Sequence, residues 1–232
     1  ALLEWSARNR WREPDAERAA TALREQGLDA GEELIAVALE LTGAFLGSGI
    51  REEIGDGRVS AEVPFVLSVG GTLVRGSIDL LVERTDGSVL VVDYKTDRLN
   101  GREPAEIVSR YSVQRDLYAL AAAARGMPLE TAYVFLERPD PPVRQGFGDT
   151  ELGAARERVE ALLERLAAGR FDVTHHPHRS LCLDCPARER LCSHETAAQM
   201  REDPDPPIVP AGDVQPADGR DCEPQLSLLE GP

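Results

Sequence analysis

Three charged residues lie within or just after two apolar segments that the sequence predicts to be neighbouring strands. Asp79 falls within the alternating segment 78–83, whereas Asp93 and Lys95 follow the apolar segment 89–92. Side chains two residues apart on a strand project from the same face, so Asp93 and Lys95 should share a face. An Asp-Gly pair between the two segments predicts a tight hairpin turn. We therefore expect two carboxylates and one ammonium group to converge at this hairpin.

Such a convergence predicts hydrolysis of a phosphodiester with the help of a divalent cation. Carboxylate oxygens are ligands that suit Mg²⁺ and Mn²⁺. An ion of this kind can activate water, and Lys95 beside it would stabilise the charge that develops in the transition state. Lys95 is the only lysine in the chain, which favours a need for a compact point charge here. The alternative is a surface hairpin on which Asp93, Lys95 and Asp97 are solvated charges.

The complete pattern resembles the PD-(D/E)xK nuclease superfamily, and within it the RecB-like nuclease domain of UvrD/Rep-type and AddAB-type helicase-nucleases. The matching residues, within a resemblance that covers about residues 60–195, are Gly76-Ser77-Ile78-Asp79, Val92-Asp93-Tyr94-Lys95-Thr96 and Gln114-Arg115-Asp116-Leu117-Tyr118. The resemblance implies a Mg²⁺-dependent deoxyribonuclease, exonuclease or endonuclease, of DNA repair or recombination. It also implies that the catalytic residues are Asp79, Asp93, Lys95, Gln114 and Tyr118, and that the metal ligands are Asp79, Asp93 and Tyr94.

The segments around this motif have the periodicity of helices and strands that could position it. Residues 1–48 predict helices that end near Gln26 and Leu46, with apolar residues at helical spacing. Further predicted elements are a strand at Glu62–Val69, a helix at Pro104–Arg125, a strand at Thr131–Glu137 and a helix at Thr150–Ala168. The expected fold class is α/β, a mixed central sheet flanked by helices, as in restriction-endonuclease-like nuclease cores, with added N-terminal helices.

The domain organisation expected from this pattern is one nuclease domain followed by a tail. The domain would span residues 1–200, with N-terminal helices at 1–48, the nuclease core at 60–170 and a cysteine segment at 175–195. Residues 201–232 are acidic and rich in proline, and they are expected to be disordered. The sequence contains no P-loop and no helicase motif, so the resemblance implies a UvrD-like helicase module upstream on the same polypeptide.

Two further sets of residues are secondary candidates for the site. Arg110, Gln114 and Tyr118 are spaced four apart, so they share one face of the predicted helix, although an ordinary amphipathic helix would show the same spacing. Glu62 opens a predicted strand, where a solvated carboxylate is the simpler interpretation. In the family a histidine on an earlier helix also binds the metal. No histidine precedes His175 in this chain, so we expect the chain to begin just after the position of the family's histidine.

The net charge of −15 argues against a general attraction to nucleic acid. The resemblance implies that the partner is DNA, at its single-stranded ends. Contacts with DNA would then depend on a local patch of positive charge. The arginines expected in the patch are Arg75, Arg98, Arg102, Arg110 and Arg115, of which Arg110 and Arg115 lie in the motif helix. An acidic, lysine-poor composition also fits a halophilic or GC-rich source. No segment is apolar enough to cross a membrane and no signal peptide is recognisable, so a cytoplasmic protein is expected.

Three cysteines near the end of the predicted domain form the pattern C-x₂-C-x₆-C. In an intracellular chain this spacing predicts metal ligation, and thiolates suit Zn²⁺ or an iron–sulfur cluster. By the resemblance, Cys182, Cys185 and Cys192 would provide three ligands of a [4Fe–4S] cluster whose fourth cysteine lies upstream, with Cys222 as a substitute. The rival is a zinc site completed by one histidine of His175, His176, His178 and His194. Three unligated cysteines are the remaining alternative.

Three functions from different classes therefore compete at this point. The first is a metal-dependent DNA nuclease domain of a helicase-nuclease. The second is a catalytically silent nuclease-like module that binds DNA, and the third is a metal-stapled structural domain. Silent members would be expected to lose Asp79, Asp93 or Lys95, and the chain retains all three.

Overall fold

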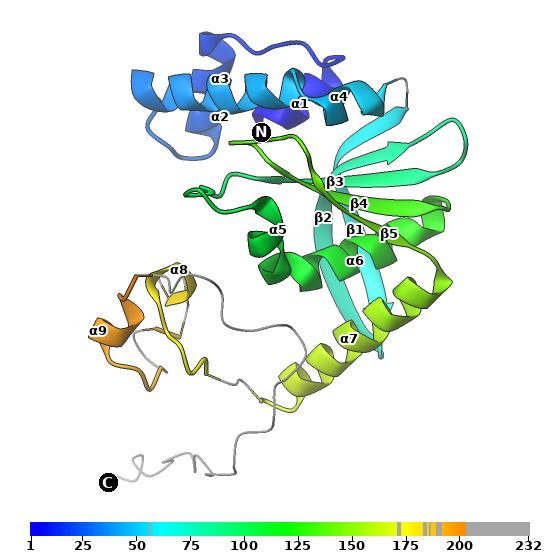
Figure 1. Cartoon of the computed structure of the whole chain (residues 1–232), viewed down its shortest axis with the longest axis vertical. Helices are drawn as coiled ribbons and strands as arrows, with labels where there is room; N and C mark the ends of the chain where they lie inside the picture. Colours follow the sequence, from blue (N-terminus) through cyan, green and yellow to red (C-terminus); the bar gives the residue numbers. More distant parts are fainter. Residues whose placement is uncertain (56, 171–172, 183–184, 186, 189–191, 203–232) are drawn as a thin grey trace, which may run out of the picture.

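A five-stranded mixed sheet forms the centre of the protein. The computed structural model describes residues 1–55, 57–170, 173–182, 185, 187–188 and 192–202 (Figure 1). The strands, in the order in which they lie side by side, are β1 (Arg58–Val69), β2 (Thr72–Glu83), β3 (Val89–Lys95), β4 (Leu129–Phe135) and β5 (Val143–Phe147). Only the β3–β4 pair is parallel among these strands. The expected α/β class with a mixed central sheet is therefore confirmed.

The hairpins that carry the motif form where the sequence predicted them. β1 and β2 join through Gly70 and Gly71, both of which have positive φ angles of 53° and 78° that favour glycine. β3 is apolar at each of its first four residues because both of its faces are covered, as is usual for a strand in a parallel pair. Its last residues, Asp93 to Lys95, extend beyond this apolar run.

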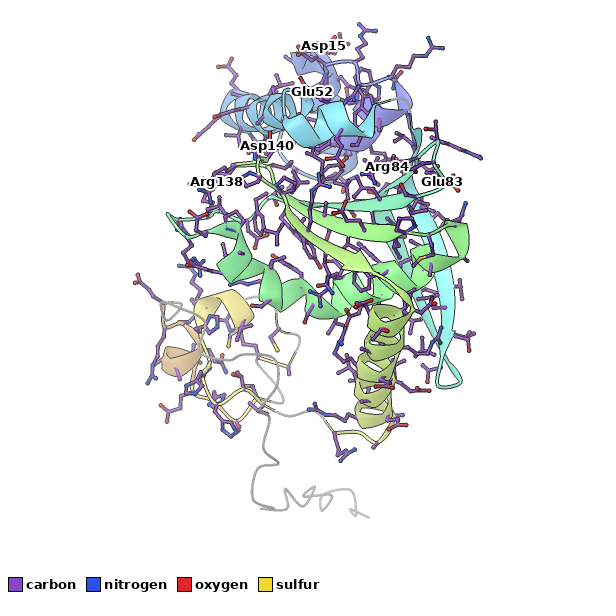
Figure 2. All side chains as sticks on the ribbon, turned by 45° about the vertical axis from the view of Figure 1, so that its right-hand side comes forward. Asp15, Glu52, Glu83, Arg84, Arg138 and Asp140 are labelled. Atoms are coloured by element: carbon purple, nitrogen blue, oxygen red, sulfur yellow. The ribbon has the colours of Figure 1, made fainter. Side chains whose placement is uncertain are left out.

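Four helices cover one face of the sheet (Figure 1). They are α1 (Leu2–Arg8), α2 (Ala16–Glu25), α3 (Glu32–Leu46) and α4 (Gly49–Ile54). Asp15 caps α2 by accepting a hydrogen bond from the Arg18 amide at 2.8 Å. The predicted helical segments are confirmed, and the short α4 is an addition. Asp140, in the loop after β4, accepts a hydrogen bond from the Gly49 amide at 2.7 Å and so ties α4 to the sheet (Figure 2).

The opposite face of the sheet is covered by α6 (Ser112–Ala122) and α7 (Asp149–Ala167). The prediction of one continuous helix from Pro104 to Arg125 was wrong. The segment is divided into α5 (Pro104–Ile107), the 3₁₀ turn η1 (Val108–Tyr111), α6 and a final 3₁₀ turn, η2 (Ala123–Arg125). Side chains three apart eclipse in a 3₁₀ turn, and this places Val108 and Tyr111 together against Tyr133 and Phe135.

Two apolar layers result, one on each side of the sheet. Leu80, Val92 and Phe45 are among the fully buried residues of the layer under the N-terminal helices. The other layer lies under α6 and α7. Because both layers meet at β3, this strand and its charged end are held rigidly.

The C-terminal part of the described chain contains two short helices, α8 (Arg179–Cys182) and α9 (Thr196–Gln199), which contact each other away from the sheet (Figure 1). The expected tail from residue 201 lies outside the described residues except for Arg201 and Glu202. Among the helices that the structure describes, none is long and apolar enough to cross a membrane.

Candidate active site

The neighbouring strands β2 and β3 bring the three predicted motif residues together. Asp93 and Lys95 project from the same face of β3, and Lys95 Nζ lies 2.8 Å from Asp93 Oδ2. Asp79 on β2 joins them because its Oδ2 accepts a hydrogen bond of 3.1 Å from the Tyr94 amide. The structure thus shows the two carboxylates and the ammonium group in one place.

Asp93 is held in a setting that opposes its negative charge. The residue is 4% exposed, and burial raises the pKa of its carboxyl to about 7, with the Asp79 carboxylate adding to the rise and Lys95 opposing it. Asp93 Oδ2 is fully buried, and the Lys95 ammonium, 2.8 Å away, offsets only part of its negative charge. An oxygen in this state is one that a bound cation would satisfy.

Lys95, Gln114 and Tyr118 form a continuous chain of polar contacts. Lys95 Nζ donates to Gln114 Oε1 at 2.7 Å, and Gln114 Nε2 donates to Tyr118 Oη at 2.9 Å. An ammonium group can only donate, so the Gln114 amide must turn its oxygen to Lys95 and its NH₂ group to Tyr118. Tyr118 Oη therefore accepts from Gln114, which leaves its own proton available for donation.

Two aromatic rings that the sequence analysis did not select also surround Lys95. Its ammonium lies 4.0 Å from the centroid of the Tyr111 ring and 5.5 Å from that of Tyr133. Tyr111 is three residues before Gln114 and so is on the same side of a helical segment. This spacing was the available signal, but β4, which carries Tyr133, gave none.

A glycine of the motif makes room for the side chain that supports Tyr118. A Cβ atom at Gly76 would lie 2.5 Å from Cζ of Phe65, which faces it across the β1–β2 pair. The Phe65 ring in turn packs edge-on against Tyr118, with ring centroids 6.0 Å apart. The glycine is thus required by close packing on the site.

With this geometry established, comparison with known proteins identifies the family. The family model of the PD-(D/E)XK nuclease superfamily matches residues 1–192. The chain belongs to the PD-(D/E)XK nuclease superfamily. The expected membership, drawn from the motif residues, is therefore confirmed.

Curated relatives add the context of helicase-nucleases. The chain is 39% identical over 101 residues to an ATP-dependent helicase/nuclease subunit of Desulforudis audaxviator, covering 38% of this chain and 8% of that protein. It is 30% identical over 129 residues to the protein of the same name from Pelotomaculum thermopropionicum, covering 49% of this chain and 10% of that protein. The chain thus spans about a tenth of the length of these relatives. The expected RecB-like helicase-nuclease context is in agreement with these relatives.

A distant structural likeness is to a crystal structure from Eubacterium rectale named as a candidate exonuclease. The TM-score is 0.43 at 12% identity, over 71% of this chain and 63% of the other.

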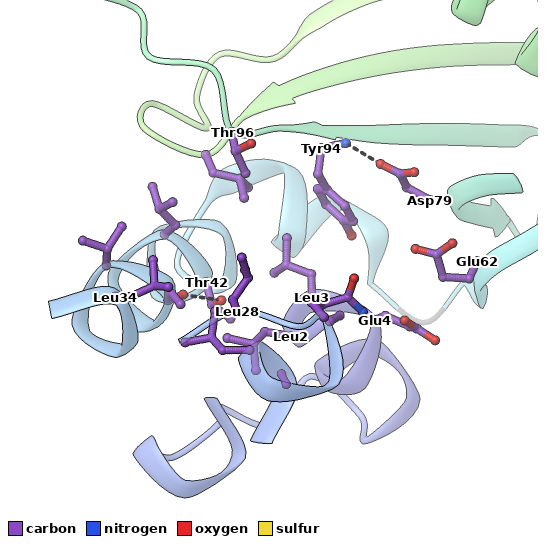
Figure 3. Close-up of a pocket in the computed structure, with 18 residues that line it drawn as sticks. Leu2, Leu3, Glu4, Leu28, Leu34, Thr42, Glu62, Asp79, Tyr94 and Thr96 are labelled. Carbon is purple, nitrogen blue, oxygen red and sulfur yellow. Dashed lines mark hydrogen bonds between the residues drawn. The ribbon is translucent and has the colours of Figure 1, made fainter. Parts of the chain in front are cut away.

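An apolar cavity of about 430 Å³ adjoins the superfamily motif on the side of the N-terminal helices. Asp79 and Glu62 lie at one end of the cavity, and Leu34 lies at the other (Figure 3). Glu62 accepts a 3.2 Å hydrogen bond from Ser77 and is exposed. The cavity leaves the Asp79 carboxylate accessible, whereas Asp93 is enclosed.

Tyr94, the third expected metal ligand, has its side chain on the other face of β3. Its ring packs edge-on against Phe45, with centroids 4.9 Å apart, and burial with the nearby Asp79 charge raises the pKa of its phenol. The contact of Tyr94 with the motif carboxylates is through its main-chain amide, which donates to Asp79 Oδ2.

The expected arginine patch is divided. Arg75, Arg98 and Arg110 are exposed, and Arg110 Nη1 lies 3.9 Å from Asp97 Oδ1. Arg115 is less accessible, and its Nη2 lies 3.3 Å from the buried Asp116 carboxylate. Because Arg115 has this partner inside the protein, it is a poorer candidate for a contact with DNA than Arg110.

The described part of the chain does not assemble the three cysteines into a metal site. Cys182 is buried, Cys192 is partly buried and Cys185 is exposed, and none forms a disulfide among these residues. The described residues contain no group of three or more His, Cys, Asp or Glu side chains placed to hold a metal ion. Cys222 lies outside the described residues.

Proposed function

We propose that this chain is a divalent-metal-dependent DNA nuclease domain that hydrolyses phosphodiesters at the Asp79–Asp93–Lys95 site. The observation that carries the proposal is the convergence of two carboxylates, of which Asp93 is buried, on one buried ammonium group, with Lys95 Nζ 2.8 Å from Asp93 Oδ2. A structural ion pair does not need this arrangement, because the second carboxylate, Asp79, repels the Asp93 charge and adds nothing to the pair with Lys95.

The residues present fit a hard divalent cation such as Mg²⁺ or Mn²⁺. Asp79 and Asp93 would hold it, with the main chain of Tyr94 beside them, and Mg²⁺ usually needs only one or two carboxylates because it keeps several waters. When bound, such an ion supplies an activated water and offsets the charge of the phosphate.

The chain's own side chains would orient the phosphate and stabilise charge on it. Lys95 brings the compact positive charge, and Gln114 holds the ammonium group by accepting one of its hydrogen bonds. Tyr118 accepts from Gln114, so its proton can be donated to a phosphate oxygen. Arg110, exposed in η1 just before α6, would contact the DNA backbone.

The biological setting that we infer is a helicase-nuclease of DNA repair or recombination in the cytoplasm. The two relatives named as ATP-dependent helicase/nuclease subunits support this inference. We also infer that single-stranded ends are the substrate and that a helicase module belongs to the same polypeptide. The three cysteines would bind a soft metal centre, either a [4Fe–4S] cluster or Zn²⁺.

The first test compares three Asp→Asn variants, which preserve side-chain shape. Asp79→Asn and Asp93→Asn should each lower Mg²⁺- or Mn²⁺-dependent cleavage of single-stranded DNA by about 10²-fold or more, because each removes a negative metal ligand. Asp86→Asn, in the turn of the same hairpin, is the matched control and should retain cleavage. Circular dichroism checks that the fold is intact. Undiminished cleavage by either site variant would refute the metal assignment.

The second arm uses Lys95→Arg, which keeps a positive charge but replaces the compact ammonium group. Loss of one transition-state stabiliser typically costs about 10²-fold in rate, and we expect this loss with little change in DNA binding. If the unmodified protein binds DNA and cleaves none with either metal, the silent DNA-binding module is the better description.

A further inference from the structure

We propose that Tyr111 is a positioning residue for Lys95: its ring holds the ammonium group toward the reacting phosphate, and Asp97 fixes the ring. This inference rests on the proposed nuclease function. It assigns a role to two residues of the loop and turn that follow β3.

The contacts of Lys95 show that its ammonium group is enclosed on several sides. The side chain is 10% exposed, and its Nζ has Asp93 Oδ2 at 2.8 Å and Gln114 Oε1 at 2.7 Å. The face of the Tyr111 ring, 4.0 Å from Nζ, covers a further side. A cation that has lost most of its water gains more from an aromatic face than an exposed one does.

Tyr111 is itself held by two hydrogen bonds, one at the tip of its side chain and one at its main chain. Its hydroxyl donates a 2.6 Å hydrogen bond to Asp97 Oδ1, and its carbonyl oxygen accepts a 2.7 Å hydrogen bond from the Tyr133 hydroxyl. Burial, together with the Asp97 carboxylate, raises the pKa of Tyr111, so the phenol stays protonated and keeps donating. Donation to a carboxylate also places more electron density on the ring, which strengthens its attraction for the ammonium group.

Fixing Lys95 in this way has a kinetic consequence. A lysine side chain has four rotatable bonds and loses rotamer freedom when it is ordered. If the ring keeps the ammonium group in place before the substrate arrives, that loss does not add to the barrier of the chemical step. Removal of the ring should therefore lower kcat and leave the KM for DNA nearly unchanged.

The kinetic test uses two substitutions at position 111 and one control. Tyr111→Leu removes the ring and should lower kcat by about 10- to 30-fold, whereas Tyr111→Phe keeps the ring and should recover most of that loss. Val143→Ala is the control, because Val143 packs in the same small apolar cluster as Tyr111. It should lower thermal stability to a similar extent without changing kcat.

A spectroscopic test exploits the single lysine of the chain and needs no activity. Protein labelled with ¹³C at lysine Cε gives one lysine signal, which comes from Lys95 alone. Ring currents from Tyr111 should shift its Hε protons upfield of free lysine. The upfield shift should be lost in Tyr111→Leu and reduced in Tyr111→Phe and Asp97→Ala, both of which remove the hydrogen bond between Tyr111 and Asp97.

The two tests separate this inference from the proposed function. An unshifted Lys95 signal in the folded protein, or equal kcat for Tyr111→Leu and Val143→Ala, would overturn the positioning role even if cleavage depends on Lys95. If no DNA is cleaved at all but the signal responds to Tyr111→Leu, the aromatic contact stands and the nuclease function fails.

Discussion

At the scale of single residues, the site is dominated by the electrostatics of Asp93. Its carboxyl is buried beside a second carboxylate, and both conditions disfavour the ionised form. One lysine offsets only part of this unfavourable electrostatic energy. Such clusters of opposing charges are typical of functional sites, because a structure selected for stability alone would avoid them. The free energy of unfolding of the metal-free protein should therefore be measurably lower at neutral pH than at acidic pH.

The pH dependence of stability should reveal that penalty. The pKa of Asp93 is about 7 in the folded protein against 3.8 for an ordinary aspartate, so the folded state binds more protons between about pH 4 and pH 7. The contribution of Asp93 to the free energy of unfolding therefore falls as the pH rises through this window and is constant above it. Thermal unfolding in EDTA at pH 5 and pH 8 measures the fall.

Asp93→Asn, which cannot ionise, is the matched variant for this measurement. We expect it to unfold at a higher temperature than the unmodified protein at pH 8 in EDTA, and to show a smaller difference between the two pH values. Mg²⁺ should restore the stability of the unmodified protein at pH 8, because it binds only the folded state. Parallel profiles for the two proteins would contradict the assignment of the raised pKa to Asp93.

At the scale of elements, the position of α6 decides where Gln114 and Tyr118 lie. A buried carboxylate anchors this helix to α7: Asp116 accepts two hydrogen bonds from Arg158, from Nε at 2.7 Å and from Nη2 at 3.0 Å. Paired hydrogen bonds between a guanidinium and a carboxylate fix direction as well as distance. Asp116 is thus a structural residue within the Gln-x-x-x-Tyr motif.

Loss of this anchor should affect both stability and cleavage. Asp116→Ala removes charge-assisted hydrogen bonds and leaves two guanidinium groups without their partner, so the free energy of unfolding should fall by about 2–3 kcal/mol. Denaturant unfolding measures this fall. Cleavage should also decrease, because α6 would no longer hold Gln114 against Lys95.

Arg8→Gln provides the control for the anchor. It breaks an exposed ion pair with Glu4 within α1, a kind of pair that contributes about 0–1 kcal/mol. Equal stability losses in Asp116→Ala and Arg8→Gln would show that the α6–α7 pair is no more than a surface contact.

At the scale of the whole molecule, the net charge of −15 and the proposed DNA substrate act against each other. Binding must then depend on local arginines near the site and on the metal ion. Arg110 lies in η1, and its Nη1 is 3.9 Å from Asp97, the residue that accepts a hydrogen bond from Tyr111 beside Lys95. Overall repulsion would limit non-specific binding along the DNA.

The cysteine segment also affects the whole molecule, because a metal centre bound there would hold the C-terminal part of the chain in place. We expect the full protein purified without oxygen to contain iron and sulfide and to lose them in air, whereas this chain alone should hold a labile cluster or none. Cys182→Ser, Cys185→Ser and Cys192→Ser should each abolish iron binding and lower thermal stability. Elemental analysis is the measurement, and zinc bound in equal amount without iron would exclude the cluster and favour the zinc site.

Local sequence was sufficient for most of the secondary structure and for the expectation that Asp79, Asp93 and Lys95 converge. The period of two in β2 and β3 placed Asp93 and Lys95 on one face, and the Asp-Gly turn placed Asp79 beside them, because side-chain direction on a strand follows from the backbone alone. The same reasoning located α2, α3 and α7 within one residue at each end, and it predicted a helix at the start of the chain without the end of α1 at Arg8. It missed α4 and β5, which are short and weakly periodic.

Only the tertiary structure decided which distant side chains complete the site. Tyr111 and Tyr133 meet Lys95, Phe65 fits over Gly76, and Asp116 pairs with Arg158. It also decided that the predicted helix breaks at η1 and that the pKa of the Asp93 carboxyl rises. The reason is common to all of these features: each depends on packing and loss of water between elements far apart in the chain, and the periodicity of one segment carries no record of what packs against it.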